Sequence, residues 1–183
     1  MPRRPREQAP GRIYHVTSRG NRGQITFASD SDRIRFLGLL ETVSRKASWT
    51  VHAYCLMQNH YHLVLEIEEP TLSSGLQQLN GVHAQTFNRC HGHVGHLFQG
   101  RFHSVRVETD AHLLELARYL PLNPVRARLC DDPADWPWSS YRGMLGISRP
   151  APFLAVDRVL GLFALDRRRA RGAFRSFVAT PRL

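Results

Sequence analysis

The sequence predicts an α+β fold of the ferredoxin-like type, a split β-α-β unit in which an antiparallel sheet carries packed helices. Two observations lead to this prediction: strand-like and helix-like segments follow one another in the order β-α-β-β-α-β, and no internal repeat interrupts them. The chain has 183 residues, 42% of them hydrophobic, which is enough to bury one sizeable core. We therefore expect one main domain over 12–145, between a flexible basic arm at 1–11 and a basic extension at 146–183.

Hydrophobic spacing gives the six elements of this unit in order. Strands are expected where aliphatic and β-branched residues dominate, and helices where apolar residues recur three and four positions apart. The predicted strands cover 13–17, 49–56, 60–67 and 102–108, and the predicted helices cover 30–47 and 72–88. Ser29 or Asp30 is expected to cap the first helix.

A third helix is predicted after the last strand, from an apolar stripe formed by Leu113, Leu116, Ala117 and Leu120, with Asp110 as its N-cap. Tyr119 lies to the side of this stripe, and Asn123 follows one turn later. Pro121 lacks the N–H that would bond a carbonyl of the preceding turn, which predicts a kink just after Tyr119. The tyrosine and the amide suggest a functional site; the alternative is a tyrosine at the core margin with a solvated hydroxyl.

Two histidines lie two residues apart in the third predicted strand. Because side chains of a strand alternate between its faces, His60 and His62 point to one face and Tyr61 points to the other. Imidazoles placed in this way can share one divalent metal ion. The alternative is that both are ordinary polar residues on a half-exposed sheet.

Positive charge indicates a polyanionic partner. The chain has 25 basic residues, all of them arginine except Lys46, against 15 acidic residues, and its formal net charge is +10. The planar guanidinium group matches phosphate better than a point charge does. A codon-biased genome would explain the ratio of arginine to lysine, but it would not explain the excess of positive charge.

Cysteine usage and hydropathy predict a cytoplasmic, nucleoid-associated protein without a membrane segment. No long apolar run and no N-terminal signal pattern is visible, and Cys55, Cys90 and Cys130 are odd in number and widely spaced. A glycine-rich loop at 90–96 contains one cysteine and three histidines, which are zinc-binding residue types. Strong zinc signatures need two separated ligand pairs, so we interpret this loop as a flexible segment with DNA-contacting groups.

Several motifs, taken in their order along the chain, resemble those of a known family. His60-Tyr61-His62 resembles the His-hydrophobic-His motif of the HUH endonucleases, and 118–127 resembles the catalytic helix of their single-tyrosine transposases. Further similar segments cover 14–20, 53–57, 95–102 and 136–141. The combination is most similar to the REP-associated tyrosine transposases, which act on short palindromic repeats. Gln58 departs from this pattern, since the family often has proline there.

The resemblance implies a metal-dependent enzyme that cleaves and rejoins single-stranded DNA at hairpin repeats, acting as a monomer or homodimer. Tyr119 would attack the phosphodiester and leave a 5′-phosphotyrosine and a free 3′-OH. His60, His62 and Asn123 would hold Mg²⁺ or Mn²⁺. The residues expected to contact DNA are arginines, namely Arg12, Arg19, Arg22, Arg101, Arg126, Arg167, Arg168 and Arg169.

Two other functions fit parts of the sequence. A non-catalytic module that binds single-stranded nucleic acid on the same fold would stack bases on His52, Tyr54 and Trp49, although the glycine-aromatic signature of RNA-recognition domains is absent. A metal-dependent hydrolase that activates water would cleave DNA without a covalent adduct. Dependence on a metal ion would distinguish the transposase from the binding module. A covalent protein–DNA adduct would distinguish the transposase from the hydrolase.

Overall fold

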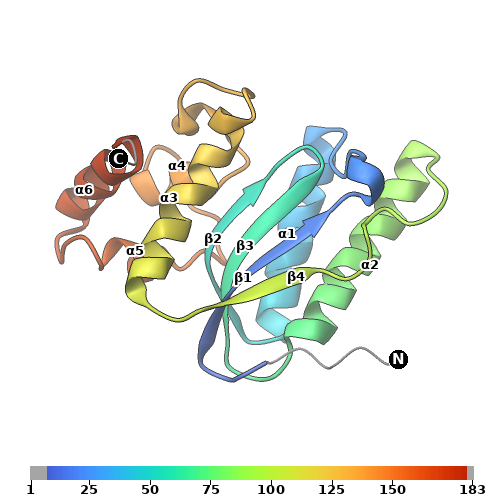
Figure 1. Cartoon of the computed structure of the whole chain (residues 1–183), viewed down its shortest axis with the longest axis horizontal. Helices are drawn as coiled ribbons and strands as arrows, with labels where there is room; N and C mark the ends of the chain where they lie inside the picture. Colours follow the sequence, from blue (N-terminus) through green and yellow to red (C-terminus); the bar gives the residue numbers. More distant parts are fainter. Residues whose placement is uncertain (1–7, 181–183) are drawn as a thin grey trace.

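The computed structural model describes residues 8–180, which form a four-stranded antiparallel sheet with helices on both faces (Figure 1). The strands are β1 (Arg12–Arg19), β2 (Trp49–Leu56), β3 (His60–Ile67) and β4 (His103–Val107), arranged in the order β2-β3-β1-β4. Because β1 lies between β3 and β4 and each pair is antiparallel, the predicted split β-α-β topology is confirmed.

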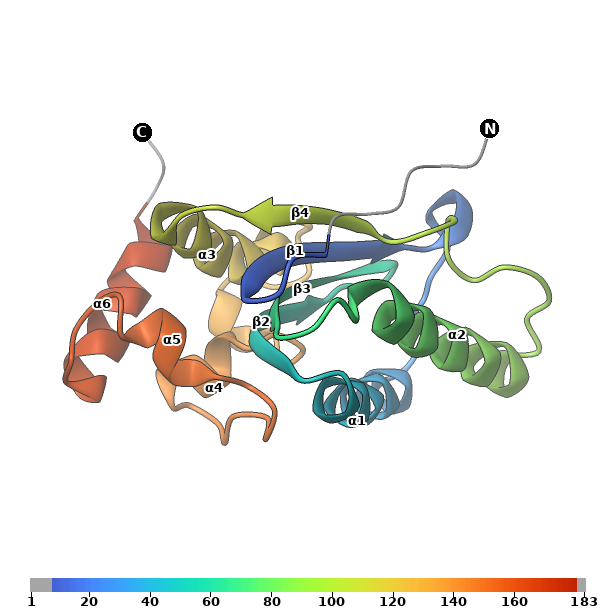
Figure 2. The ribbon, with the colours of Figure 1, turned by 90° about the horizontal axis from the view of Figure 1, so that it is seen from below.

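Two helices, α1 (Asp30–Lys46) and α2 (Leu72–His91), pack side by side on one face of the sheet (Figure 2). Most of the strand side chains that face them are apolar or aromatic and at most 2% exposed, among them Tyr14, Val16, Tyr61, Leu63 and Leu65. Ser18 is also buried there and accepts a hydrogen bond from Asn80 of α2. Burial of the apolar and aromatic side chains is the main source of the hydrophobic driving force for this layer. The alternation predicted for the strands therefore places the principal core between the sheet and these two helices.

The third predicted helix is α3 (Asp110–Arg126), and it packs on the opposite face against β2 and β4. Its N-cap is Thr109, whose side chain accepts a hydrogen bond from the backbone N–H of His112, so the predicted cap at Asp110 is one residue late. The helix continues through both of its prolines. The predicted kink at Pro121 therefore does not end it, and Asn123 stays one turn beyond Tyr119.

The chain after α3 folds back against that helix. It contains η2 (Pro133–Asp135), α4 (Tyr141–Leu145), α5 (Val156–Leu160) and α6 (Arg167–Ala179), and its helices α4, α5 and α6 gather beside the edge strand β2 (Figure 1). Ala170, Phe174 and Val178 of α6 are at most 2% exposed, and this helix contacts α3, α4 and α5. The short basic helix expected in the C-terminal extension is α6, and its apolar side supports α3.

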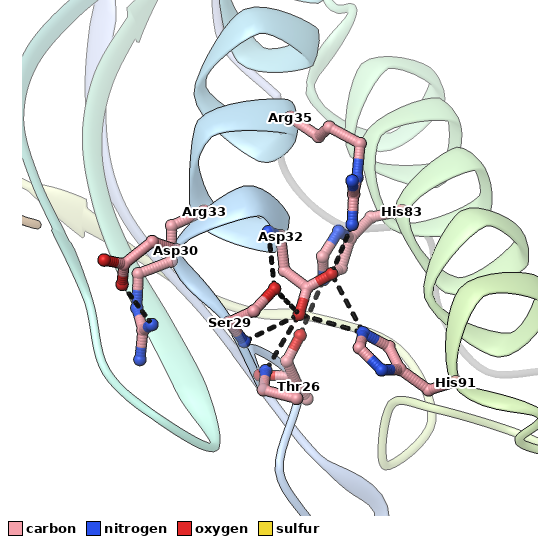
Figure 3. A network of polar contacts seen from close by, with 9 residues as sticks. Thr26, Ser29, Asp30, Asp32, Arg33, Arg35, His83 and His91 are labelled. Atoms are coloured by element: carbon pink, nitrogen blue, oxygen red, sulfur yellow. Dashed lines mark hydrogen bonds and ion pairs between the residues drawn. The ribbon is translucent and has the colours of Figure 1, made fainter.

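A polar network joins the start of α1 to the end of α2 (Figure 3). The Asp32 carboxylate is 1% exposed and accepts hydrogen bonds from the Ser29 backbone N–H at 2.9 Å, from Arg35 at 2.6 Å and from His91 at 3.0 Å. Burial raises the pKa of Asp32, but the hydrogen bonds from His91, Ser29 and Arg35 outweigh it and lower the pKa to about 2. The network includes the capping box of α1, and it fixes the last turn of α2.

Candidate active site

The sheet face opposite α1 and α2 carries the two predicted histidines. His60 and His62 of β3 share this face, and their ring centroids are 5.0 Å apart. Arg19 and Thr17 of β1 lie directly opposite them in the strand register. Tyr61, between the histidines, points to the other face and donates a 2.7 Å hydrogen bond to Asn80 of α2. The structure therefore brings His60 and His62 together as their spacing predicts.

His15 of β1 is a third histidine at this site, and the sequence reasoning missed it. Its Nε2 atom lies 2.9 Å from Nδ1 of His62, and the two rings stack with centroids 5.1 Å apart. The hydroxyl of Thr17 lies 3.3 Å from the same His62 nitrogen. The only signal in the sequence was that His15 falls in a predicted strand, because its contact with His62 depends on the pairing of β1 with β3.

Burial keeps the histidines of this site neutral. Burial lowers the pKa of His62 to about 3, assisted by the neighbouring His15 and His60, and it lowers the pKa of His15 to about 4. For His60, burial and the nearby Arg19 guanidinium also lower the pKa. A neutral imidazole has one nitrogen with a free lone pair, which is the form that binds a metal ion.

The hydrogen bonds of His60 indicate which of its nitrogens is free. The Asn59 side chain donates from Nδ2 to the carbonyl of Gly23 at 3.1 Å, so its Oδ1 atom faces His60 as an acceptor. His60 Nδ1 lies 2.8 Å from this oxygen and therefore carries the proton that it donates. The lone pair of the neutral ring is then on Nε2. Asn59 is a second contributor that sequence reasoning missed.

The corresponding nitrogen of His62 is also unpaired. His62 Nε2 is buried and has no hydrogen-bond partner among residues 8–180, whereas Nδ1 faces His15 and Thr17. When Nδ1 holds the proton and donates it to either neighbour, Nε2 keeps its lone pair. Two imidazole nitrogens on adjacent positions of one face thus fit a divalent cation.

Tyr119 of α3 lies beside these histidines within the same chain. Its ring meets His62 edge to face, with centroids 5.6 Å apart, and it meets His15 at 6.4 Å. The guanidinium carbon of Arg126 is 5.4 Å from the centroid of the Tyr119 ring. Tyr119 also borders a pocket of about 220 Å³ that Glu115 lines. The site therefore combines a phenol, neutral imidazoles and a cation.

Asn123, the third predicted metal ligand, uses its side chain within α3. Its Nδ2 atom donates a 2.9 Å hydrogen bond to the carbonyl of Tyr119, which leaves Oδ1 as the atom able to bind a cation. Within the described part of the chain, Asn123 makes no hydrogen bond to His60 or His62, and no cluster of three or more His, Cys, Asp or Glu side chains is arranged to hold a metal ion. The role of Asn123 as a ligand stays a prediction.

Two of the predicted DNA-binding arginines lie at this site. Arg19 is opposite His60 in the register, and Arg126 lies beside Tyr119. Arg12 lies at the other end of β1, where it is opposite Ile67. It is roughly 23 Å from Arg19 along the strand.

The other predicted arginines are exposed on separate surfaces. Arg22 lies in the short helix η1 (Asn21–Gly23) with a left-handed backbone, φ 53°, and Arg101 lies in the loop before β4. Arg167, Arg168 and Arg169 begin α6, where Arg167 forms an ion pair with Asp157. The structure thus spreads the predicted arginines over several faces of the molecule.

The residues proposed as a base-stacking surface are inside the protein. His52 is 1% exposed, and Tyr54 and Trp49 are 6% exposed. Trp49 Nε1 donates to the side chain of Thr71 at 3.0 Å. These three rings cannot receive bases without unfolding, which disfavours the binding module that stacks bases on them.

Comparisons with known proteins agree with this geometry. The family model described as "Transposase IS200 like" matches residues 11–122, so the chain belongs to this family of DNA-processing enzymes. The matched segment includes His15, His60, His62 and Tyr119, and it ends one residue before Asn123. No curated protein matches the sequence.

Solved structures that are similar to the chain include two transposases. A REP-associated tyrosine transposase bound to a REP hairpin has a TM-score of 0.66 and 18% sequence identity, covering 86% of this chain and 90% of that one. A candidate transposase from Deinococcus radiodurans R1 has a TM-score of 0.44 and 16% identity, covering 64% of this chain and 94% of that one. The first likeness shows the α+β fold. Within residues 8–180, no helix has the length and apolar character needed to cross a bilayer.

Proposed function

We propose that the protein cleaves and rejoins single-stranded DNA at hairpin repeats, through a covalent intermediate on Tyr119 and with a divalent metal ion. The observation that carries this proposal is the position of Tyr119, whose ring lies 5.6 Å from that of a histidine with an unpaired Nε2. Membership of the IS200-like family supports the reaction class. The solved relative that holds a REP hairpin supports the substrate class.

Tyr119 supplies the nucleophile. Its oxygen attacks the phosphorus of a phosphodiester, the bond from phosphorus to the 3′ oxygen breaks, and the leaving oxygen takes a proton to become a free 3′-OH. The 5′-phosphate is then esterified to Tyr119. Attack on this ester by a 3′-OH reverses the exchange and rejoins the strand. No external energy source is needed, because one phosphate ester replaces another.

His60, His62 and Asn123, through Nε2, Nε2 and Oδ1, are the residues that would hold Mg²⁺ or Mn²⁺. The bound ion would supply a Lewis acid for the scissile phosphate. His15 and Asn59 orient the two imidazoles through their Nδ1 atoms. Arg126, beside the Tyr119 ring, adds positive charge where the phosphate must lie during attack.

Tyr119 of α3 and the histidines of β1 and β3 meet within one chain, without a second copy. This arrangement supports cleavage by a monomer. The contacts of α6 with α3 hold the helix in this position: Arg118 donates to the carbonyl of Thr180, and its guanidinium carbon lies 5.2 Å from the centroid of Phe177.

The proposal is tested with the full chain, a labelled single-stranded hairpin oligonucleotide and Mn²⁺. We expect a protein–DNA adduct that survives denaturation in the wild type and in Tyr61→Phe, and none in Tyr119→Phe or after chelation of the metal. Cleaved DNA without an adduct would replace the proposal with hydrolysis by water. DNA binding without cleavage, both with and without metal, would contradict the proposal and indicate a non-catalytic binding module.

A further inference from the structure

A groove runs along α2, close to the end of β1. It lies on the opposite side of that strand end from the histidines. It consists of two adjoining pockets of about 590 Å³ and 410 Å³ that share Asn80, Gly100 and Arg101. We call it the α2 groove. Its walls are the exposed side of α2 and the loop from 95 to 102. The polar side chains of this groove are mainly amides, namely Asn21, Gln77, Asn80, Gln85 and Asn88.

The α2 groove differs in charge from the pocket near Arg12. None of the described residues that line it is acidic, and Arg101 has no ion pair with any residue in 8–180. By contrast, the pocket near Arg12 contains Glu66, Glu108 and Asp110. A phosphate would meet carboxylates in that pocket, but in the α2 groove it would meet only Arg101, His96 and neutral groups.

The loop that forms one wall of the α2 groove is held in place by hydrogen bonds. Gln24 Nε2 donates to the carbonyls of His96 and Leu97 at 3.0 and 2.9 Å, and Asn88 Nδ2 donates to the carbonyl of Gly95 at 2.9 Å. Leu97 is only 1% exposed and anchors the loop in the core. His91, through Asp32, fixes the last turn of α2 (Figure 3). The groove is therefore formed before any ligand binds, which lowers the entropic cost of binding.

The α2 groove and the histidine site meet at the end of β1. Gly20 pairs with Phe98 of the groove wall, and the backbone N–H of Gln99 donates to the carbonyl of Arg19 at 2.8 Å. Arg19 in turn lies opposite His60. The end of β1 therefore connects the histidine site with the wall of the groove.

We propose that the α2 groove binds unpaired nucleotides of the DNA strand whose phosphodiester lies at Tyr119, a proposal that rests on the proposed function. Asn80 and Asn88 use their amides within the protein, toward Tyr61, Ser18 and the carbonyl of Gly95. The exposed amides of Gln77 and Gln85 are left to pair with bases, and unpaired bases offer them their Watson–Crick edges as well as their Hoogsteen edges. Arg101 would contact a phosphate between two such bases. The occupant is thus the single-stranded segment beside the hairpin, whereas the paired stem lies elsewhere.

Two groove variants and two matched controls test this assignment. Arg101→Ala removes the cation, and Gly81→Leu fills the groove, because a Cβ at Gly81 has no atom within 4 Å. Arg89→Ala removes an exposed arginine of the same helix that does not line the groove. Gly38→Leu adds the same side chain to an equally open position of α1. Both leucines replace a glycine within a helix and should not destabilise it.

Affinity is measured by fluorescence anisotropy for two probes, a blunt hairpin and the same hairpin with a short single-stranded extension. We expect each groove variant to bind the extended probe about tenfold more weakly, and to bind the blunt probe as the wild type does. Both controls should match the wild type on both probes. An equal loss on both probes, or no loss on the extended one, would overturn the proposal.

The same samples are assayed for the Tyr119 adduct, which separates this proposal from the proposed function. An adduct with unchanged binding by the groove variants contradicts only the groove assignment. Selective loss of the extended probe without any adduct in the wild type supports the groove and contradicts the cleavage reaction.

Discussion

The two faces of the four-stranded sheet differ in what their side chains do. One face packs against α1 and α2 with aromatic and aliphatic residues, and Tyr61, Leu63 and Leu65 are at most 2% exposed there. The other face carries His60 and His62, and His62 meets the ring of Tyr119. Because these residues alternate within β3, one strand contributes to both layers. The principal core and the chemistry of the site therefore lie on opposite faces, and substitutions at neighbouring residues can separate their effects.

The first prediction contrasts His62 with its neighbour Leu63. His62→Ala should lower the rate of cleavage by about a thousandfold or more, because the metal ion loses a ligand, while DNA binding changes little. Leu63→Ala should lower the free energy of unfolding by about 2–5 kcal/mol, because it leaves a cavity in the core. Both are checked by cleavage kinetics and denaturant unfolding. Normal cleavage by His62→Ala would contradict this division between the faces.

The second prediction concerns His15, which contacts His62 from β1. His15→Ala should weaken Mn²⁺ binding by about 10–100-fold, because His62 loses the neighbour that orients its ring. The measurement is calorimetric titration of the DNA-free protein with Mn²⁺. His96→Ala is the control, since His96 is an exposed histidine of the loop before β4, outside the histidine site. If His15→Ala bound Mn²⁺ with wild-type affinity, His15 would have no role in metal binding.

The third prediction concerns the layer formed by α1 and α2, and it tests how much the Asp32 carboxylate contributes to stability. Its pKa is about 2 in the folded protein against an ordinary value of 3.8, so the carboxylate stabilises the fold above about pH 4. This contribution, on the order of 2 kcal/mol, is lost as the pH falls from about 4 to 2. Asp32→Asn should therefore destabilise the protein at neutral pH and flatten the acid limb of its stability curve.

The control for Asp32 is Asp30→Asn. Asp30 has a side chain 75% exposed and pairs with Arg33 at 3.5 Å, so its removal should change stability by less than about 0.5 kcal/mol. Equal effects of the two substitutions, measured by thermal unfolding across this pH range, would contradict the role of the buried network.

The smallest effect is expected from the exposed arginines of α6. Replacing Arg168 and Arg169 by alanine should weaken binding to single-stranded DNA, and the log–log slope of affinity against salt should become shallower by about 0.7 for each phosphate that is no longer neutralised. Anisotropy titrations over a range of salt concentrations give this slope. An unchanged slope would restrict the role of α6 to supporting α3.

The sequence was sufficient to predict the elements and to place Tyr119 near the face that carries His60 and His62. The predicted strands at 49–56 and 60–67 match β2 and β3 in both bounds, because aliphatic, β-branched and aromatic residues dominate both segments. Tyr119 meets His62 as the offset of the tyrosine from its apolar stripe suggested. His15 and Asn59 could not be found in this way, since one needs the pairing of two strands and the other needs the direction of an amide.

The helix with two prolines shows a second limit. Local rules predict a kink after Tyr119, but α3 continues to Arg126, and the Asn123 amide donates to the carbonyl of Tyr119. Packing of α3 between the sheet and α6 holds these residues in a helix despite the missing N–H groups. Such tertiary support depends on residues far away in the sequence, and local patterns do not report it.

Covalent linkage of Tyr119 to DNA is the step on which the proposed mechanism depends, and peptide mapping of the adduct tests it directly. Trypsin cuts after Arg118 and Arg126, and the resulting peptide 119–126 contains Tyr119 as its only tyrosine. After reaction with the hairpin substrate and nuclease trimming, mass spectrometry should find the added nucleotide mass on this peptide, joined through a 5′-phosphate. The same mass on a peptide that contains Tyr14, Tyr54, Tyr61 or Tyr141, or cut DNA with no modified peptide, would contradict this linkage.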